Sequence, residues 1–137
     1  MALVAIITTA CNQSGLSSAQ STTPEAQNTG YRTLTIDQFA DILANQSDAY
    51  TVVNVHIPYA GQIAGTDLLI PYDDVKALTA ILRDKNAPII LYCRSGRMSE
   101  ETSRALIELG FTQVWDVPGG MNAWTASGRQ LRQEDSG

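Results

Sequence analysis

The residues with the clearest chemical potential form one short stretch around Cys93. An apolar run, residues 88–92, ends directly at this cysteine, and Arg94, Gly96 and Arg97 follow within four positions. A helical pattern begins just after them, so we expect the thiol between the end of a strand and the start of a helix. Helix N-termini carry unpaired amides and about half a positive charge, and two guanidinium groups add full charges. Each feature favours a thiolate over a thiol, as a nucleophile requires.

Two other interpretations of this cysteine are less favoured by its surroundings in the sequence. A lone cysteine at a strand end is often a small buried hydrophobic residue, and Arg94 and Arg97 alone could be surface charges. The combination of strand, cysteine, basic glycine-containing loop and helix start favours the nucleophile. A cysteine-dependent phosphatase would need an arginine after five intervening residues, but position 99 is Ser. The loop is therefore too short to surround a phosphate in that manner.

Alternating strand and helix patterns surround the cysteine. Strands are expected at residues 50–55, 88–92 and 113–117, and helices from 36, 75, 99 and after Gly119-Gly120, with residues 56–72 as a loop. Thr35 and Gln38 have the spacing of a capping box, and Asp73 or Asp74 caps the second helix. The alternation predicts an α/β fold, a parallel central sheet with helices on both faces. Ligands bind such sheets beyond the carboxyl ends of the strands, where Cys93 lies.

Composition excludes several classes of function. The chain has 137 residues and a net charge of −5, which argues against a nucleic-acid partner because such partners require a basic surface. One histidine and two cysteines do not make a credible metal site, so we expect no metal and no cofactor. The length fits one domain, expected at residues 31–137.

The N-terminal residues differ in character from this domain. Residues 1–11 are short and mostly apolar and end in Ala10-Cys11, like a bacterial lipoprotein signal in which Cys11 is lipidated. Residues 12–30 are rich in Ser, Thr, Gln and Asn, which predicts a flexible linker. We therefore expect a cell-envelope protein, lipid-anchored or secreted. The alternatives are an irregular soluble N-terminus and, less favoured, a disulfide between Cys11 and Cys93.

Two motifs resemble those of a known family. Residues 91–99, Leu-Tyr-Cys-Arg-Ser-Gly-Arg-Met-Ser, resemble the active-site loop of the rhodanese family of single-domain sulfurtransferases. Residues 117–124, Val-Pro-Gly-Gly-Met-Asn-Ala-Trp, are similar to its C-terminal Gly-Gly-x-x-x-Trp signature. The pattern from Tyr31 to about Arg132 covers one whole rhodanese domain.

The resemblance implies a reaction and its residues. Cys93 would take a sulfane sulfur from an anionic donor such as thiosulfate, as a persulfide, and pass it to cyanide or a thiol. The residues that would bind the substrate are Arg94, Ser95, Gly96, Arg97 and Met98, through their backbone amides and the two arginine charges. We expect a monomer whose contact with a membrane is limited to the lipid anchor.

The first half of the chain departs from the family pattern. Many members read Asp-Val-Arg where this chain reads Asn54-Val55-His56, which implies that a local salt bridge is absent and alters the mouth of the site. His56 is expected to be structural. This departure leaves two alternatives open: a non-catalytic module that binds an anion or a protein, and a persulfide carrier with poor turnover on thiosulfate. Trp115 and Trp124 are expected to pack in the core, and Glu100 and Glu101 to face solvent.

Overall fold

The computed structural model describes residues 30–134. The expected lipoprotein signal with Cys11, and the linker apart from Gly30, lie outside the described residues. Within the described part of the chain, no helix is both long and apolar enough to cross a membrane.

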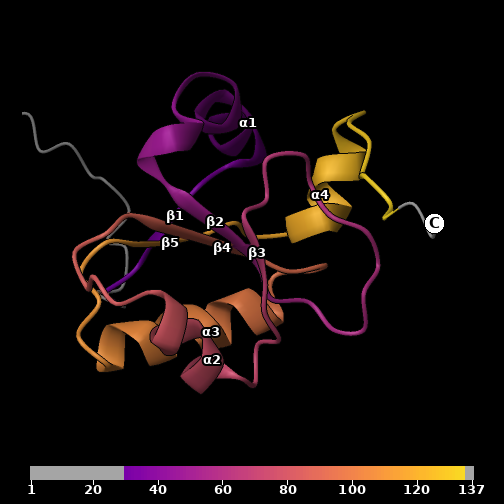
Figure 1. Cartoon of the computed structure of the whole chain (residues 1–137). Helices are drawn as coiled ribbons and strands as arrows, with labels where there is room; N and C mark the ends of the chain where they lie inside the picture. The colour runs from indigo at the N-terminus through magenta and orange to yellow at the C-terminus, as the bar shows by residue number, and fades with distance from the viewer. Residues whose placement is uncertain (1–29, 135–137) are drawn as a thin grey trace, which may run out of the picture.

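Within residues 30–134, five parallel strands form one sheet in the order β1-β5-β4-β2-β3 (Figure 1). The strands are β1 (Arg32–Thr33), β2 (Thr51–Asn54), β3 (Leu68–Leu69), β4 (Ile89–Tyr92) and β5 (Val114–Asp116). The central strand β4 is buried along its whole length, as its continuous apolar sequence predicts.

Helices cover both faces of the sheet, which confirms the predicted fold class (Figure 1). The α-helices of the described residues are α1 (Ile36–Asn45), α2 (Val75–Ile81), α3 (Arg97–Glu108) and α4 (Gly120–Ala126). A short 3₁₀ turn, Ser47–Ala49, leads into β2. Helices α1 and α4 pack one apolar cluster against the sheet around Phe39 and Trp124, and α2 and α3 pack a second around Leu78 and Leu106.

Local sequence signals explain where two of the helices begin. The Gln38 amide donates to the Thr35 hydroxyl at 3.1 Å, and the Gln38 side chain accepts from the Thr35 amide at 2.9 Å, which completes the predicted capping box of α1. For α2, the Asp74 carboxylate accepts from the Ala77 amide at 3.0 Å, so Asp74 is the cap.

The structure also contains elements that the sequence patterns did not indicate. Strands β1 and β3 have two residues each, too few for any periodicity to be visible, and β3 lies inside the predicted loop 56–72. Helix α3 begins at Arg97 rather than near residue 99. Gly96 permits this early start because it adopts a left-handed φ of 114° as the N-cap.

The strand register brings three polar side chains to one edge of the sheet. Asn54 ends β2, Cys93 follows β4, and Asp116 ends β5. Asn54 pairs with Tyr92, and Leu91 pairs with Asp116, so these positions are neighbours across adjacent parallel strands. The candidate site lies at this carboxyl edge.

Candidate active site

The Cys93 side chain is held from two directions by the loop that follows it. It is only 1% exposed, and its sulfur accepts a hydrogen bond from the Gly96 amide at 2.9 Å. The Ser99 hydroxyl lies 3.6 Å from the same sulfur and 3.0 Å from the Gly96 carbonyl oxygen. The chain thus curls around the sulfur within one turn, as a loop that stabilises an anionic sulfur must.

Further backbone donors lie at the start of α3. The first intrahelical bond runs from the Glu100 amide to the Gly96 carbonyl at 3.0 Å. The amides before Glu100, those of Arg97, Met98 and Ser99, therefore have no carbonyl partner within the helix. Together with the Gly96 amide they form a positive end next to the sulfur.

The Gly119-Gly120 pair forms the wall against which the cysteine loop packs. A Cβ on Gly120 would lie 2.0 Å from the Cys93 carbonyl oxygen, so no larger residue fits there. The Met121 amide donates to that same oxygen at 2.9 Å, and the Asn122 amide donates to the Arg94 carbonyl at 2.9 Å. The two motifs of the sequence, 27 positions apart between Cys93 and Gly120, are therefore two halves of one structure.

The two arginines of the loop have different environments. Arg97 pairs with Glu101 at 2.6 Å and lies over the Tyr72 ring at 5.8 Å, so part of its charge is already balanced. Arg94 is exposed, and its positive charge acts on the buried His56. From the sequence, both arginines are expected to attract an anion equally. In the structure, Glu101 partly neutralises Arg97, whereas no carboxylate within the described residues pairs with Arg94.

A cavity lies on each side of the cysteine loop. The Arg94 side holds about 240 Å³, and the Arg97 side about 400 Å³. The Arg94 side is lined by Ala60, Arg94, Met121, Asn122, Thr125 and Leu131. The Arg97 side is lined by Tyr31, Thr33, Ser95, Gly96, Arg97, Glu100, Asp116, Pro118 and Gly119.

Two other predicted binding residues, Ser95 and Met98, lie in different environments. Ser95 is exposed and lines the Arg97 side. Met98 is half-buried, and its side chain packs against the core cluster of α2 and α3, so it can contribute its amide but not its side chain. The loop thus contains all five predicted residues; Gly96 has no side chain, and the side chains of the other four lie in different surroundings.

Sequence reasoning missed Asp116. It is only 4% exposed, and its Oδ1 atom has no hydrogen-bond partner, which is true of no other buried side-chain nitrogen or oxygen in residues 30–134. Burial raises the pKa of Asp116 to about 6, Ser99 and the Val117 backbone oppose the rise, and the Glu100 charge adds to it. The Glu100 side chain is 43% exposed, in line with the expectation that it faces solvent, and its charge still acts on Asp116. An acid ending a strand was visible in the sequence, but its place beside the cysteine loop depends on the strand order.

The departure at residues 54–56 has a structural replacement. The Asn54 side chain accepts from the His56 amide at 3.0 Å and donates to the Gly61 carbonyl at 3.2 Å. These bonds tie down the loop after β2 without a charge, and no ion pair involves Asn54 or His56 within the described residues. Burial, with the nearby Arg94 charge, lowers the pKa of His56, so the imidazole is favoured in its neutral form.

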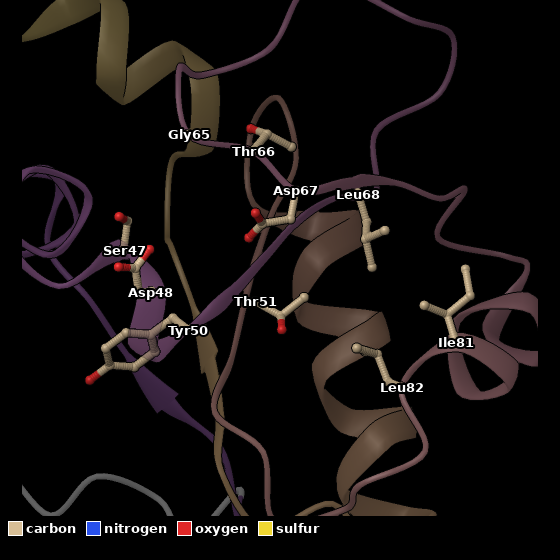
Figure 2. A pocket seen from close by; sticks show the side chains of 10 residues that line it. All are labelled: Ser47, Asp48, Tyr50, Thr51, Gly65, Thr66, Asp67, Leu68, Ile81 and Leu82. Atoms are coloured by element: carbon tan, nitrogen blue, oxygen red, sulfur yellow. The ribbon is translucent and has the colours of Figure 1, made fainter.

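Another hollow, of about 600 Å³, lies away from the cysteine loop (Figure 2). It opens near the amino-terminal end of β2, where Thr51 begins the strand, and near Asp67 and Leu82. Cys93 follows the carboxyl end of β4, so this hollow is at the opposite end of the parallel sheet from the thiol.

Comparisons with known proteins identify the family of this domain. The rhodanese-like domain family matches residues 36–127, a range that includes the cysteine loop and the Gly-Gly pair. A thiosulfate sulfurtransferase GlpE from Coxiella burnetii is 37% identical over 43 residues, which are 31% of this chain and 40% of that protein. The GlpE of Actinobacillus pleuropneumoniae is 40% identical over 45 residues, 33% of this chain and 42% of that protein. The chain therefore matches only about two fifths of the length of these curated relatives.

A solved structure supports the same assignment over a greater length. A rhodanese-related protein from Thermoplasma volcanium superposes with a TM-score of 0.63 and 26% identity, covering 76% of this chain and 100% of the other. The family match extends over more than half of the chain and contains the candidate site. The chain belongs to the rhodanese-like domain family, whose sulfurtransferases include its curated relatives.

Proposed function

We propose that the protein is a sulfurtransferase that carries a sulfane sulfur on Cys93 as a persulfide. The observation that supports this most directly is the hydrogen bond from the Gly96 amide to the Cys93 sulfur, 2.9 Å long, at the carboxyl edge of the parallel sheet. A backbone amide in that position stabilises a negative sulfur in place, without having to reorient during the reaction.

The proposed chemistry has two half-reactions. The Cys93 thiolate attacks the outer sulfur of thiosulfate, the sulfur–sulfur bond of the donor breaks, and sulfite leaves with the bonding electron pair. Cyanide or a thiolate then attacks the outer sulfur of the persulfide and regenerates the Cys93 thiolate, giving thiocyanate or a new persulfide. A covalent intermediate of this kind divides the transfer into two steps and predicts ping-pong kinetics.

The backbone amides at the start of α3 would stabilise the persulfide. Its outer sulfur carries the negative charge and would extend from Cys93 toward the unpaired amides at the start of α3. Arg94 would attract the donor, because it is exposed and no ion pair with it occurs in residues 30–134. The sulfur itself is nearly buried, which suits a small donor that reaches it end-on.

Intact mass spectrometry tests the proposal. The full chain incubated with thiosulfate should gain one sulfur atom, and cyanide or a reduced thiol should remove it. Cys93→Ser should abolish the gain while the circular dichroism spectrum stays unchanged, because the two side chains are nearly the same size. Cys11→Ser is the matched control and should retain the gain.

Three outcomes distinguish the proposal from its alternatives. A protein that gains no sulfur from thiosulfate or from a polysulfide is not a sulfurtransferase, and the binding-module interpretation replaces this one. A protein that gains sulfur but releases it only to one protein acceptor, and not to cyanide, is a persulfide carrier. Gain and release in steady turnover establish the enzyme.

A further inference from the structure

The hollow of about 600 Å³ at the amino-terminal end of β2, here called the amino-end groove, has two walls of different chemistry (Figure 2). Five of its ten lining residues are exposed, so it is an open groove at the surface and not an enclosed cavity. Figure 2 shows the polar side chains of Ser47, Asp48 and Tyr50 on one side and the apolar side chains of Leu68, Ile81 and Leu82 on the other. Asp67 lies between the two walls (Figure 2).

The amino-end groove carries negative charge that no basic side chain in it balances. Asp48 is exposed and forms no ion pair within the described part of the chain. The Asp67 carboxylate accepts a hydrogen bond from the Val52 amide at 2.8 Å, which fixes its position but does not neutralise it. No Lys or Arg among the described residues lines the groove, and the nearby Arg83 donates to the Ala80 carbonyl at 3.3 Å. The groove therefore favours a ligand with a positive group.

The opposite wall exposes apolar surface. Ile81 ends α2 and is 55% exposed. Leu68 is half-buried and Leu82 is buried, and both line the groove with it. An aliphatic side chain packed against Ile81 would remove this surface from water. A ligand that matches both walls carries a positive group next to an aliphatic one.

The amino-end groove adjoins an unpaired edge of the sheet. Strand β3 is the last strand in the sheet order and pairs only with β2, so its other side has no strand partner within residues 30–134. Leu68 lines the groove, and Leu69, which is 44% exposed, faces the other side of the sheet because successive side chains of a strand alternate. A sheet edge binds the main chain of an extended peptide, which a small amine does not have.

We propose that the amino-end groove docks an extended segment of a partner protein in which a lysine or arginine lies between aliphatic residues. The main chain of the segment runs along the free edge of β3, its positive side chain reaches into the groove toward Asp67 and Asp48, and an aliphatic side chain covers Ile81. The groove lies at the opposite end of the sheet from Cys93, so a docked partner leaves the thiol uncovered. Docking there does not depend on the chemistry of Cys93.

Titration of the full chain with synthetic peptides, followed by NMR of the backbone amides, tests this docking. The probe is acetyl-Val-Lys-Ile-Lys-Val-amide, and its two matched controls have Glu in place of Lys, or Ser in place of Val and Ile. The probe should shift the amides of the groove residues at concentrations up to about 2 mM, and each control should bind at least about fivefold more weakly. Absence of these shifts with the probe overturns the proposal, and so does equal binding of either control.

Variants separate the charge from the apolar contact. Asp48→Asn and Asp67→Asn should each weaken binding of the probe about threefold, and Ile81→Ser about fivefold. Asp73→Asn and Leu109→Ser make the same kinds of change at exposed positions outside the groove and should leave the affinity unchanged. Equal losses in the groove variants and their controls overturn the proposal. If Asp67→Asn does not fold, Asp48→Asn decides the question, since no hydrogen bond or ion pair of the described residues uses the Asp48 side chain.

Other occupants of the groove give different results. A probe with N-methyl groups on its internal amides should bind about fivefold more weakly, because it cannot donate to the edge of β3. Equal binding of the methylated probe, or equal shifts with hexylamine, means that the groove takes a small cation, which overturns the proposal. A dimer that the probe dissociates, seen by sedimentation equilibrium, means that a second copy occupies the groove and also overturns it. Cys93→Ser should bind the probe as the unmodified chain does, so failure of sulfur uptake leaves this result unaltered.

Discussion

Each side of the cysteine loop holds one buried titratable group, and burial shifts the pKa values of the two groups in opposite directions. On the Arg94 side, burial and the arginine charge lower the pKa of His56. On the Arg97 side, burial raises the pKa of Asp116 to about 6. Both shifts favour the uncharged form, so the groups beside the thiol tend toward neutrality near pH 6. The positive field at Cys93 therefore comes mainly from backbone amides and the exposed Arg94.

The opposite shifts give opposite contributions to stability. His56 resists protonation in the folded state, so its contribution is lost as pH falls below 6.5 toward its lowered pKa. Asp116 retains its proton in the folded state, so its contribution is present at low pH and is lost as pH rises from 3.8 through about 6. The Gly119-Gly120 wall lines the Arg97 side through Gly119 and packs against the backbone of Cys93 and Arg94 through Gly120. It has no titratable side chain, so its contribution to stability should not depend on pH.

Breaking that shared wall should have the largest effect. In Gly120→Ala the new Cβ would overlap the Cys93 carbonyl oxygen, a backbone atom that cannot rotate away, and Gly120 has a φ of 47°. Strain and overpacking should lower the free energy of unfolding by about 4 kcal/mol and abolish sulfur uptake. Denaturant unfolding and intact mass measure both effects.

The matched control for this substitution is Gly128→Ala. Gly128 has a φ of 87°, but a Cβ there meets no atom within 4 Å. It should cost only the backbone strain, about 1 kcal/mol, and should leave sulfur uptake intact. Equal losses in the two variants would mean that backbone strain, and not contact with the cysteine loop, makes Gly120 necessary.

Removing the buried acid on the Arg97 side should have the next largest effect, and it should depend on pH. At pH 8 the folded protein bears the cost of an ionised, buried Asp116, since its pKa is raised from 3.8 to about 6. Asp116→Asn should therefore increase the free energy of unfolding by about 2 kcal/mol at pH 8 and change it little at pH 4. Asp48→Asn, at an exposed position, should change it at neither pH. A gain of equal size at both pH values would exclude ionisation as its cause.

Much of the scaffold that supports these sides was predictable from the sequence. Thr35 and Gln38 predict the start of α1 because a capping box is local, and the apolar run before Cys93 predicts a buried strand for the same reason. The position of Asp116 beside the cysteine loop was not predictable, because it depends on β5 lying next to β4, and the sequence of neither strand specifies which strand it pairs with. Two-residue strands such as β3 form only because β2 offers an unpaired edge.

The same limit applies to the two arginines of the loop. Their spacing from Cys93 predicts that both attract an anion, but only the fold shows that Glu101 and Tyr72 flank Arg97. Glu101 lies one helical turn after Arg97, so their pairing was visible in retrospect once the helix was known to begin at residue 97. The sequence pattern placed the start of this helix two residues too late, so the pairing of Arg97 with Glu101 was not predicted.

The smallest expected effect sharpens the comparison between the two sides. Arg94→Ala should lower kcat/KM for thiosulfate about tenfold, because a charged hydrogen bond to an anion contributes about 1.5 kcal/mol. Arg97→Ala should lower it only about twofold, since Glu101 already compensates that guanidinium at 2.6 Å and its side chain is 64% exposed. Arg94→Lys should recover part of the loss, and raising the salt concentration should narrow the difference between the two alanine variants. Equal losses would show that the Glu101 pair opens when the donor binds, and that the two sides of the loop attract it alike.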